Sequence, residues 1–384
     1  MPLSLYFHLP YCRRKCPYCD FYKSVPREGE TSRFIGTLAK EVLLTRQQLT
    51  WAEMDPIRSI YFGGGTPSLH SSAEIGQILA RVSDLWSISP EAEITLEANP
   101  GTLENKDFED LLKIGVNRLS IGVQSFTNRK LSLLYRDHSI ADSRQCVDFA
   151  QRAGFKNISL DLIFGLPAET IEEWRHDINN ALELAPQHVS LYNLEYHEGT
   201  PLDRWRKAGK WLPLGSDLEA ELYLLTNNLL TAAGFQHYEV SNFAREGFRA
   251  VHNAVYWKGE PCLSFGPSAF SFDGNRNRHA NVANIETYRS QVEAGELPID
   301  RRWTNNDQEQ AEEWISGCLR QSAGIAKSVA ETRIGKTLTD RLWTAAAGLP
   351  ESHRELNNLS FRLTPKGWFV ENEILGFLFD RIHK

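Results

Sequence analysis

The sequence predicts an α/β fold, a partial (β/α)6, TIM-like barrel followed by a C-terminal α+β, winged-helix-like domain. Two observations predict it. Over the first half of the chain, short runs rich in β-branched and aromatic residues alternate with amphipathic runs, as in a parallel sheet with right-handed crossovers. From about Asn305 onward, short helical patterns lead into a hairpin and a last helix.

Six strand patterns and their intervening helices can be placed in order. Strands are expected at Leu3–Leu9, Ile57–Phe62, Glu93–Glu97, Val116–Gln124, Asn157–Ile163 and His188–Leu194. Helices are expected at Phe34–Leu49, Ala73–Val82, Asn105–Ile114, Ala141–Ala153, Thr170–Leu184 and Asp217–Ala233. The pattern predicts three domains: the barrel at residues 1–235, an extension of strands and loops wrapped over it at 236–304, and the winged-helix-like domain at 305–384.

Composition indicates an ordinary soluble globular protein. The 384 residues are 41% hydrophobic and 24% charged, which excludes fibrous and disordered classes. The formal net charge of −7 argues against nucleic-acid binding. The same argument applies to a DNA-binding role of the winged-helix-like domain. Neither a membrane-spanning apolar run nor a signal-peptide pattern is found, so we expect a cytoplasmic protein whose six cysteines stay reduced.

Three of the cysteines crowd into one short segment. Cys12, Cys16 and Cys19 form a C-x₃-C-x₂-C run directly after the first predicted strand. Thiolates suit iron–sulfur clusters, and three of them leave one iron of a four-iron cube open to a chelating ligand. A zinc site completed by His8, or reactive thiols, are the alternatives. The position after a barrel strand, where such folds carry their chemistry, favours the cluster.

Polar residues recur at the predicted carboxyl ends of the strands. They are the turn Gly63-Gly64-Gly65-Thr66-Pro67, then Glu97, Gln124 and Asp161. Glycines allow close backbone approach to a ligand, carboxylates can accept hydrogen bonds from a ribose or an ammonium, and Arg136 can pair with a carboxylate. Each alone also fits a tight turn or a helix cap, but their ordered recurrence favours one ligand site.

Together these motifs resemble the radical S-adenosylmethionine (SAM) superfamily. Within it, further segments resemble the family of the oxygen-independent coproporphyrinogen III dehydrogenase and its relative, the haem chaperone HemW. These segments are Tyr6-Phe-His-Leu-Pro-Tyr-Cys12, Gly122-Val-Gln-Ser-Phe126, Arg136-Asp-His138 and Asp161-Leu-Ile-Phe-Gly-Leu-Pro167. The resemblance runs from Tyr6 to about Trp368.

The resemblance implies a set of cofactors and the residues that hold them. Cys12, Cys16 and Cys19 would ligate a 4Fe–4S cluster whose open iron takes SAM. Contacts to that SAM are implied for Tyr6, Tyr18, Gly64 and Glu97. The residues that hold a second SAM in the dehydrogenase correspond here to Gly65, Thr66, Gln124, Arg136 and Asp161. Reduction of the cluster by a donor such as flavodoxin or ferredoxin would cleave SAM to a deoxyadenosyl radical, and no side chain is assigned a catalytic role.

Two departures separate this chain from the dehydrogenase pattern. The dehydrogenases typically continue the triad to a fourth cysteine, where this chain has Phe21. They also carry a long N-terminal extension, whereas this sequence begins eleven residues before Cys12. Both departures weaken the reading as a decarboxylating enzyme.

The segment His252-Asn-Ala-Val-Tyr256-Trp257 matches the HNxxYW pattern of HemW-type proteins. An imidazole can ligate haem iron, while Tyr and Trp offer flat apolar surface to a porphyrin. The plainer interpretation is a hydrogen-bonded loop histidine beside a buried Trp. Alternative iron ligands are Cys262, His279 and Cys146.

The leading hypothesis is a cytoplasmic haem chaperone that keeps a radical SAM core and passes haem to an acceptor protein. The alternatives are the coproporphyrinogen III dehydrogenase and another radical SAM methylase or tailoring enzyme. Expected partners are haem, the acceptor and an electron donor, without nucleic acid, and with membrane association only through the acceptor.

Overall fold

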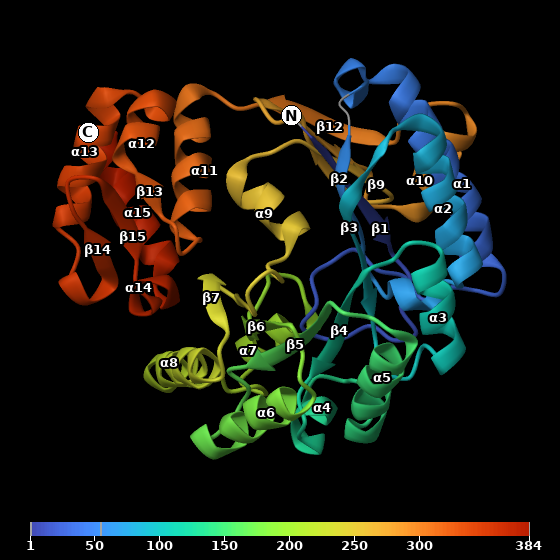
Figure 1. Ribbon diagram of the computed structural model, residues 1–384, viewed down its shortest axis with the longest axis horizontal. Coiled ribbons are helices and arrows are strands. Elements are labelled where there is room, and N and C mark those ends of the chain that lie inside the picture. Colours follow the sequence, from blue (N-terminus) through green and yellow to red (C-terminus); the bar gives the residue numbers. More distant parts are fainter. Residues whose placement is uncertain (1, 54–55, 384) are drawn as a thin grey trace. The chain divides into compact units, whose positions relative to one another are not determined.

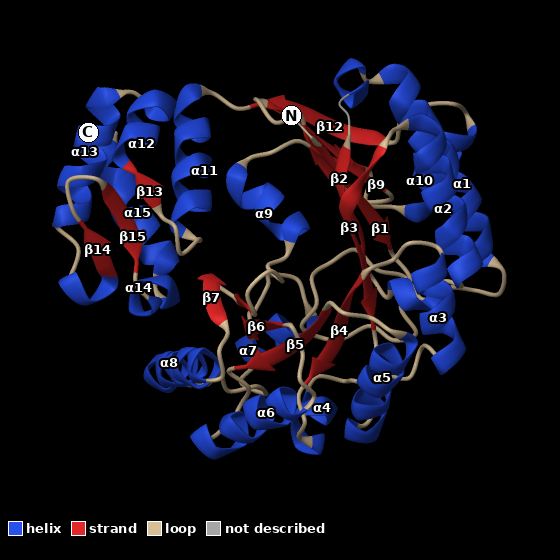
Figure 2. Ribbon diagram, in the orientation of Figure 1, coloured by secondary structure: helices blue, strands red, loops and turns tan. Residues whose placement is uncertain are grey.

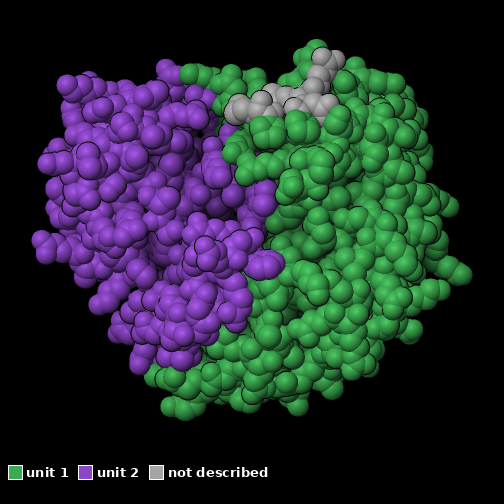
Figure 3. All heavy atoms as spheres, in the orientation of Figure 1, with its two compact units in different colours: residues 1–214, 260–304 green, residues 215–259, 305–384 purple. Residues whose placement is uncertain are grey.

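The computed structural model describes residues 2–53 and 56–383 and separates into two compact units. Unit 1 comprises residues 1–214 and 260–304, and unit 2 comprises residues 215–259 and 305–384 (Figure 3). The three predicted segments are therefore redistributed: 215–259 groups with the C-terminal part, and 260–304 groups with the barrel. The division of the chain into three functional domains remains a prediction.

Unit 1 is built on the six expected parallel strands, which occur side by side in chain order. They are β1 (Leu3–Leu9), β2 (Ile57–Gly64), β3 (Ile88–Ala98), β4 (Arg118–Gln124), β5 (Ile158–Phe164) and β6 (His188–Asn193). Their helices are α1 (Glu30–Gln48), α2 (Ser72–Leu85), α3 (Asn105–Lys113), α4 (Asn128–Leu133), α5 (Ile140–Ala153), α6 (Ile171–Glu183) and α7 (Pro201–Lys207). Figure 1 shows helices α1 to α6 along the outer face of a curved, open sheet, so the predicted partial barrel is confirmed.

Local sequence explains why these elements begin where they do. Capping boxes start α2, α5 and α6, with Ser71, Ser139 and Thr170 each accepting a hydrogen bond from the backbone N–H three residues on. Strand β3 begins at Ile88, five residues before the predicted Glu93. The prediction missed this first part because Ile88–Glu91 is not buried and carries no apolar alternation.

Residues 236–304 were expected to wrap over the barrel as strands and loops, and for residues 262–304 this expectation is wrong. β9 (Cys262–Phe265) is buried throughout and pairs in parallel with β1, with Ser4 opposite Cys262 and Phe7 opposite Phe265. The antiparallel strands β10 (Phe270–Phe272), β11 (Asn277–Asn281) and β12 (Ile299–Thr304) follow, with α10 (Ile285–Glu293) between the last two. The apolar run of β9 therefore extends the sheet at its β1 edge instead of covering it.

Unit 2 has the winged-helix-like end that the sequence predicts (Figure 2). Its helices are α8 (Ser216–Ala232), α9 (Val251–Lys258), α11 (Asp307–Leu319), α12 (Lys327–Ile334), α13 (Lys336–Ala347), α14 (Pro365–Phe369) and α15 (Glu371–Ile382). Its strands are the pair β7 (Gln236–Glu239) and β8 (Asn242–Ala244) and the small sheet of β13 (Ile325–Ala326), β15 (Ser360–Leu363) and β14 (Arg354–Leu356). Helix α9 was not expected, because only His252 and Val255 are buried and no apolar stripe marks it.

Within residues 2–53 and 56–383, no helix has the length and apolar character that crossing a bilayer requires.

Candidate functional site at the strand ends

The ends of the first three strands lie side by side, as the sequence predicts. Leu9 at the end of β1 is opposite Gly64 at the end of β2. Phe62 is opposite Leu96 on β3, which places Glu97 next to the glycine turn. The cysteine segment, the glycines and Glu97 therefore meet at one edge of the sheet.

The glycine turn fastens the chain where it enters the cysteine segment. The Gly65 N–H donates to the Leu9 carbonyl (2.8 Å), and the Thr66 N–H donates to the Tyr11 carbonyl (2.7 Å). A Cβ on Gly65 would lie 2.6 Å from that Tyr11 oxygen, so only glycine permits the approach. This turn fixes the backbone immediately before Cys12.

His8 closes over the next glycine. Gly64 has φ +108°, and a Cβ there would lie 2.6 Å from the His8 ring. His8 Nε2 is hydrogen-bonded to the Tyr22 carbonyl (2.8 Å) and Nδ1 lies 3.3 Å from the Tyr6 hydroxyl. Burial lowers the pKa of His8 to about 4. Both ring nitrogens are engaged, so a zinc site completed by His8 would have to break a contact on this ring.

The three cysteines sit in one loop whose two ends are joined. Cys12 N–H donates to the Ser24 carbonyl (2.9 Å), and Ser24 N–H donates to the Pro10 carbonyl (2.7 Å). All three thiols are free and partly exposed. Burial raises the pKa of Cys12 and Cys19, and in Cys19 the Lys23 ammonium opposes that rise.

This loop has the donor set of a 4Fe–4S cluster. It offers three sulfurs on one short segment, and Arg136 Nη1 lies 3.9 Å from Cys16 Sγ, where a cation offsets thiolate charge. In the described part of the chain, no three His, Cys, Asp or Glu side chains gather around a point that fits a single metal ion. A four-iron cube places each cysteine on a different iron, so it needs sulfurs spread around a cube.

Glu97 and Asp161 are partly buried, in different polar settings. The Glu97 carboxylate accepts hydrogen bonds from the Tyr61 hydroxyl (2.7 Å) and the Gly64 N–H (3.2 Å). Burial raises its pKa to about 7, although the Tyr61 bond opposes the rise. Asp161 accepts from the Ser120 hydroxyl at 3.0 Å, and burial raises its pKa too.

The remaining SAM-contact candidates, Tyr6 and Tyr18, lie in different surroundings. Tyr6 on β1 stacks on Tyr61 with ring centroids 6.0 Å apart. Tyr18, in the cysteine loop, packs against an apolar cluster that includes Leu134 and Leu166. Tyr6 is therefore near Glu97, whereas Tyr18 lies beside Arg136 and the apolar cluster.

Asn99 is a central residue that sequence reasoning missed. Its side-chain amide donates to Thr66 Oγ1 (2.9 Å), and its Oδ1 accepts from Arg136 Nη2. The same Arg136 nitrogen donates to the Gly122 carbonyl (3.1 Å). Asn99 thus joins the glycine turn to Arg136, and its signal was a polar residue directly after the Glu97 strand end.

Gln124 ends β4 in a left-handed conformation, with φ +65°. For a residue other than glycine this conformation costs about 1 kcal/mol, and it is often found at functional sites. The strain is held by the next residues, because Ser125 Oγ (2.8 Å) and the Phe126 N–H (2.7 Å) both donate to Asp177.

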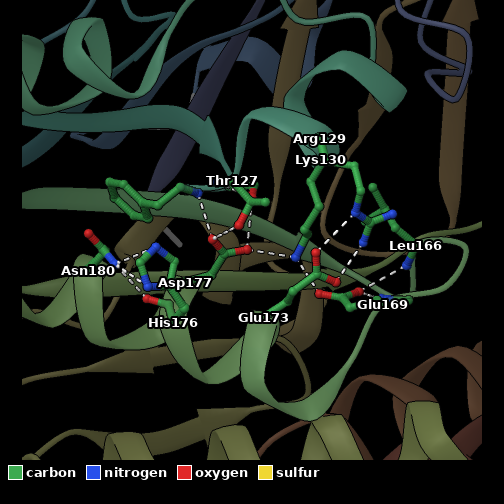
Figure 4. Close-up of polar contacts among 12 residues, drawn as sticks. Thr127, Arg129, Lys130, Leu166, Glu169, Glu173, His176, Asp177 and Asn180 are labelled. Atoms are coloured by element: carbon green, nitrogen blue, oxygen red, sulfur yellow. Dashed lines mark hydrogen bonds and ion pairs between the residues drawn. The ribbon is translucent and has the colours of Figure 1, made fainter.

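A buried charged centre, Lys130 with Glu169 and Asp177, braces two strand-end loops (Figure 4). All three side chains are buried, and the Lys130 ammonium lies 2.6 Å from the Asp177 carboxylate. Glu169 accepts hydrogen bonds from the Gly165 and Leu166 N–H groups (2.8 and 3.0 Å) after β5. The centre therefore ties the loops after β4 and β5 to helices α4 and α6. No local sequence pattern predicts it, because its three residues come from separate segments of the chain.

The HNxxYW residues lie in unit 2, on helix α9. His252 is 1% exposed and Tyr256 is 47% exposed. His252 Nε2 lies 2.9 Å from the Tyr256 hydroxyl. Trp257 packs beneath the Arg320 guanidinium, whose Cζ is 5.1 Å from the ring centroid.

The three alternative iron ligands are core residues. Cys146 on α5 and Cys262 in β9 are 4% and 2% exposed, and burial raises the pKa of Cys146 to about 12. His279 on β11 packs against Trp51, and burial lowers its pKa to about 4. Each has the setting of a packed side chain.

Comparison with known proteins agrees with this geometry. The family described as Radical SAM superfamily matches residues 6–181. The heme chaperone HemW of Synechocystis sp. is 32% identical over 100% of this chain and 98% of its own length. The heme chaperone HemW of Bacillus subtilis is 31% identical over 97% of this chain and 98% of its own.

Among solved structures, the coproporphyrinogen III oxidase HemN of Escherichia coli superimposes with a TM-score of 0.83. The superposition covers 98% of this chain and 90% of HemN at 22% identity, so it shows a shared fold. The sequence similarity to HemW extends over nearly the whole of both chains. The chain therefore belongs to the radical SAM superfamily and, within it, to the HemW family.

Proposed function

We propose that this protein is a haem chaperone, which binds haem and transfers it to an acceptor protein. The observation that carries the proposal is the end-to-end similarity to relatives named heme chaperone HemW. Helix α9 adds a local argument, since it presents Tyr256 to solvent beside His252 and Trp257. An iron ligand and flat aromatic surface are what a porphyrin requires.

Membership of the radical SAM superfamily implies a 4Fe–4S cluster and SAM. We assign the cluster to Cys12, Cys16 and Cys19, and this cofactor pair supplies one-electron chemistry when bound. The proposed contacts to SAM are Tyr6, Tyr18, Gly64 and Glu97, with Gly65, Thr66, Gln124, Arg136 and Asp161 for a second SAM.

The chain's own residues prepare this site in three ways. The glycine turn presents backbone groups to a ligand, and Glu97 places a carboxylate beside it. Arg136 Nη2 donates to Asn99 and Gly122. Its buried Nε has no partner among the described residues, so Nε is a donor available to a carboxylate.

The remaining partners are part of the proposal. Haem is the cargo, an acceptor protein receives it, and a one-electron donor such as flavodoxin or ferredoxin reduces the cluster. We propose that this takes place in the cytoplasm, with any membrane association made through the acceptor.

Anaerobic reconstitution with iron and sulfide, followed by titration with haem, tests the proposal. We expect both iron–sulfur absorbance and a Soret band, and transfer of haem to an apo acceptor that restores the acceptor's spectrum. Replacing Cys12, Cys16 and Cys19 together by serine should abolish the iron–sulfur absorbance, while Cys146→Ser, a buried cysteine outside the loop, should not. Absence of haem binding, or conversion of coproporphyrinogen III to protoporphyrinogen IX, would favour the dehydrogenase or another radical SAM enzyme.

A further inference from the structure

Helix α9 places two of its chemically active side chains one turn apart. His252 and Tyr256 stand at positions i and i+4, which lie on the same side of a helix. They differ sharply in access, because His252 is 1% exposed and Tyr256 is 47% exposed. Only the phenol of this pair is open to a large, flat ligand from solvent.

The two side chains are joined by a hydrogen bond. His252 Nε2 lies 2.9 Å from the Tyr256 hydroxyl, and the rings meet edge to face at 5.4 Å and 82°. In the imidazole tautomer that carries its proton on Nδ1, Nε2 accepts the phenolic hydrogen. The buried imidazole thus orients the exposed oxygen.

Trp257 and the neighbouring helix α11 anchor α9 on its other side. A Cβ on Gly317 would lie 2.3 Å from the Trp257 carbonyl oxygen, so α11 lies directly against α9 there. Arg320 lies over the Trp257 ring and also donates to Glu371 at 2.9 Å. Trp257 is thereby held in protein packing, which leaves Tyr256 as the aromatic residue of the motif that projects outward.

We propose that Tyr256, and not His252, supplies the protein ligand to ferric haem iron, with His252 as the positioning residue behind it. The inference rests on the proposed haem binding. A phenolate oxygen is an established type of haem ligand. As the iron–oxygen bond forms, the O–H bond breaks and the proton passes to His252 Nε2, so no electron is transferred. A single anionic ligand on an exposed side chain also suits a carrier, because an acceptor can approach and replace it.

Ferric haem titrations of the full-length protein test the assignment, with electron paramagnetic resonance and resonance Raman spectra of each complex. Tyr256→Phe should remove the high-spin ferric phenolate signature and weaken binding on the order of tenfold, which is about 1.4 kcal/mol. His252→Ala should keep a phenolate signature, shifted and with smaller loss of affinity. His252→Gln, whose amide oxygen can also accept from the phenol, should restore the affinity.

Tyr192→Phe is the matched control, since Tyr192 is similarly exposed at 45% but lies on β6. It should leave the spectrum unchanged. The assignment is overturned if Tyr256→Phe retains the wild-type spectrum, whichever other variant loses it. If the wild-type protein binds no haem at all, the proposed function itself fails, so the two failures are distinguishable. Circular dichroism confirms that each variant is folded.

Discussion

Two buried acidic centres in unit 1 hold strand-end loops by different means. One is the Lys130–Glu169–Asp177 centre, where an ammonium is enclosed with two carboxylates behind β4 and β5. The other is Glu41 on α1, which is 2% exposed and, among the described residues, accepts hydrogen bonds from neutral donors only. Its carboxyl accepts from Asn281 Nδ2 (2.6 Å), the Tyr288 hydroxyl (2.6 Å) and the Gly266 N–H (2.8 Å), directly after β9.

The difference lies in how each centre offsets the cost of burying charge. Burial raises the pKa of Glu41 to about 7, because hydrogen bonds from neutral groups only partly oppose it. Burial also raises the pKa of Glu169, but the Lys130 charge works against that rise. The charged centre should therefore be sensitive to loss of its cation, and the neutral one to pH.

The largest expected effect is loss of the buried cation. Lys130→Met leaves two buried carboxylates without their counter-charge and should destabilise the protein by about 3–5 kcal/mol, measured by urea unfolding. Arg129→Met is the control on the same helix, because the Arg129 side chain is 40% exposed and pairs with Glu173 at 2.6 Å. It should cost about 1 kcal/mol or less. Equal effects of the two substitutions would contradict the comparison.

The intermediate effect is the pH dependence of Glu41. Its folded pKa of about 7 lies above its usual value of 4.5, so the native state retains a proton that the unfolded chain releases between these values. Its stabilising contribution is complete below about pH 4.5 and falls by about 3 kcal/mol as pH rises through about 7. The free-energy difference between wild type and Glu41→Gln should therefore change by about that amount between about pH 5 and about pH 8.

Glu97 and Glu239 also have raised pKa values of about 7, so only the difference between variant and wild type isolates Glu41. Glu293→Gln, an exposed substitution, should run parallel to wild type across the same range. A Glu41→Gln curve that is also parallel would remove the distinction between the two centres.

The smallest expected change in stability comes from substitution of Gln124, whose neighbours Ser125 and Phe126 donate hydrogen bonds to Asp177 of the charged centre. Gln124 has φ +65°, where glycine has no steric penalty but alanine does. Gln124→Gly should be more stable than Gln124→Ala by about 1 kcal/mol in urea unfolding, the reverse of the order at ordinary strand positions. The ordinary order would show that the loop after β4 relaxes and is not braced in a strained conformation.

The amino-acid sequence predicted the parts of unit 1 that depend on nearby residues. Periodicity placed the six parallel strands and helices α1, α2, α3, α5 and α6, most within a few residues, because burial of one face repeats every two or about 3.6 residues. It missed the short helices α4 and α7. Periodicity failed at α9, where only His252 and Val255 are buried, and at β9, whose pairing with β1 joins residues far apart in the chain.

By itself the sequence determined the order of elements, the cysteine triad at 12, 16 and 19, and the polar residues at successive strand ends. Only the tertiary structure decided that Asn99 joins Thr66 to Arg136, that Lys130 meets Asp177, and that Tyr256 is exposed where His252 is not. Strand and helix patterns are local, whereas the partner of a buried polar group is chosen by desolvation, which acts between whichever groups the chain brings together in space.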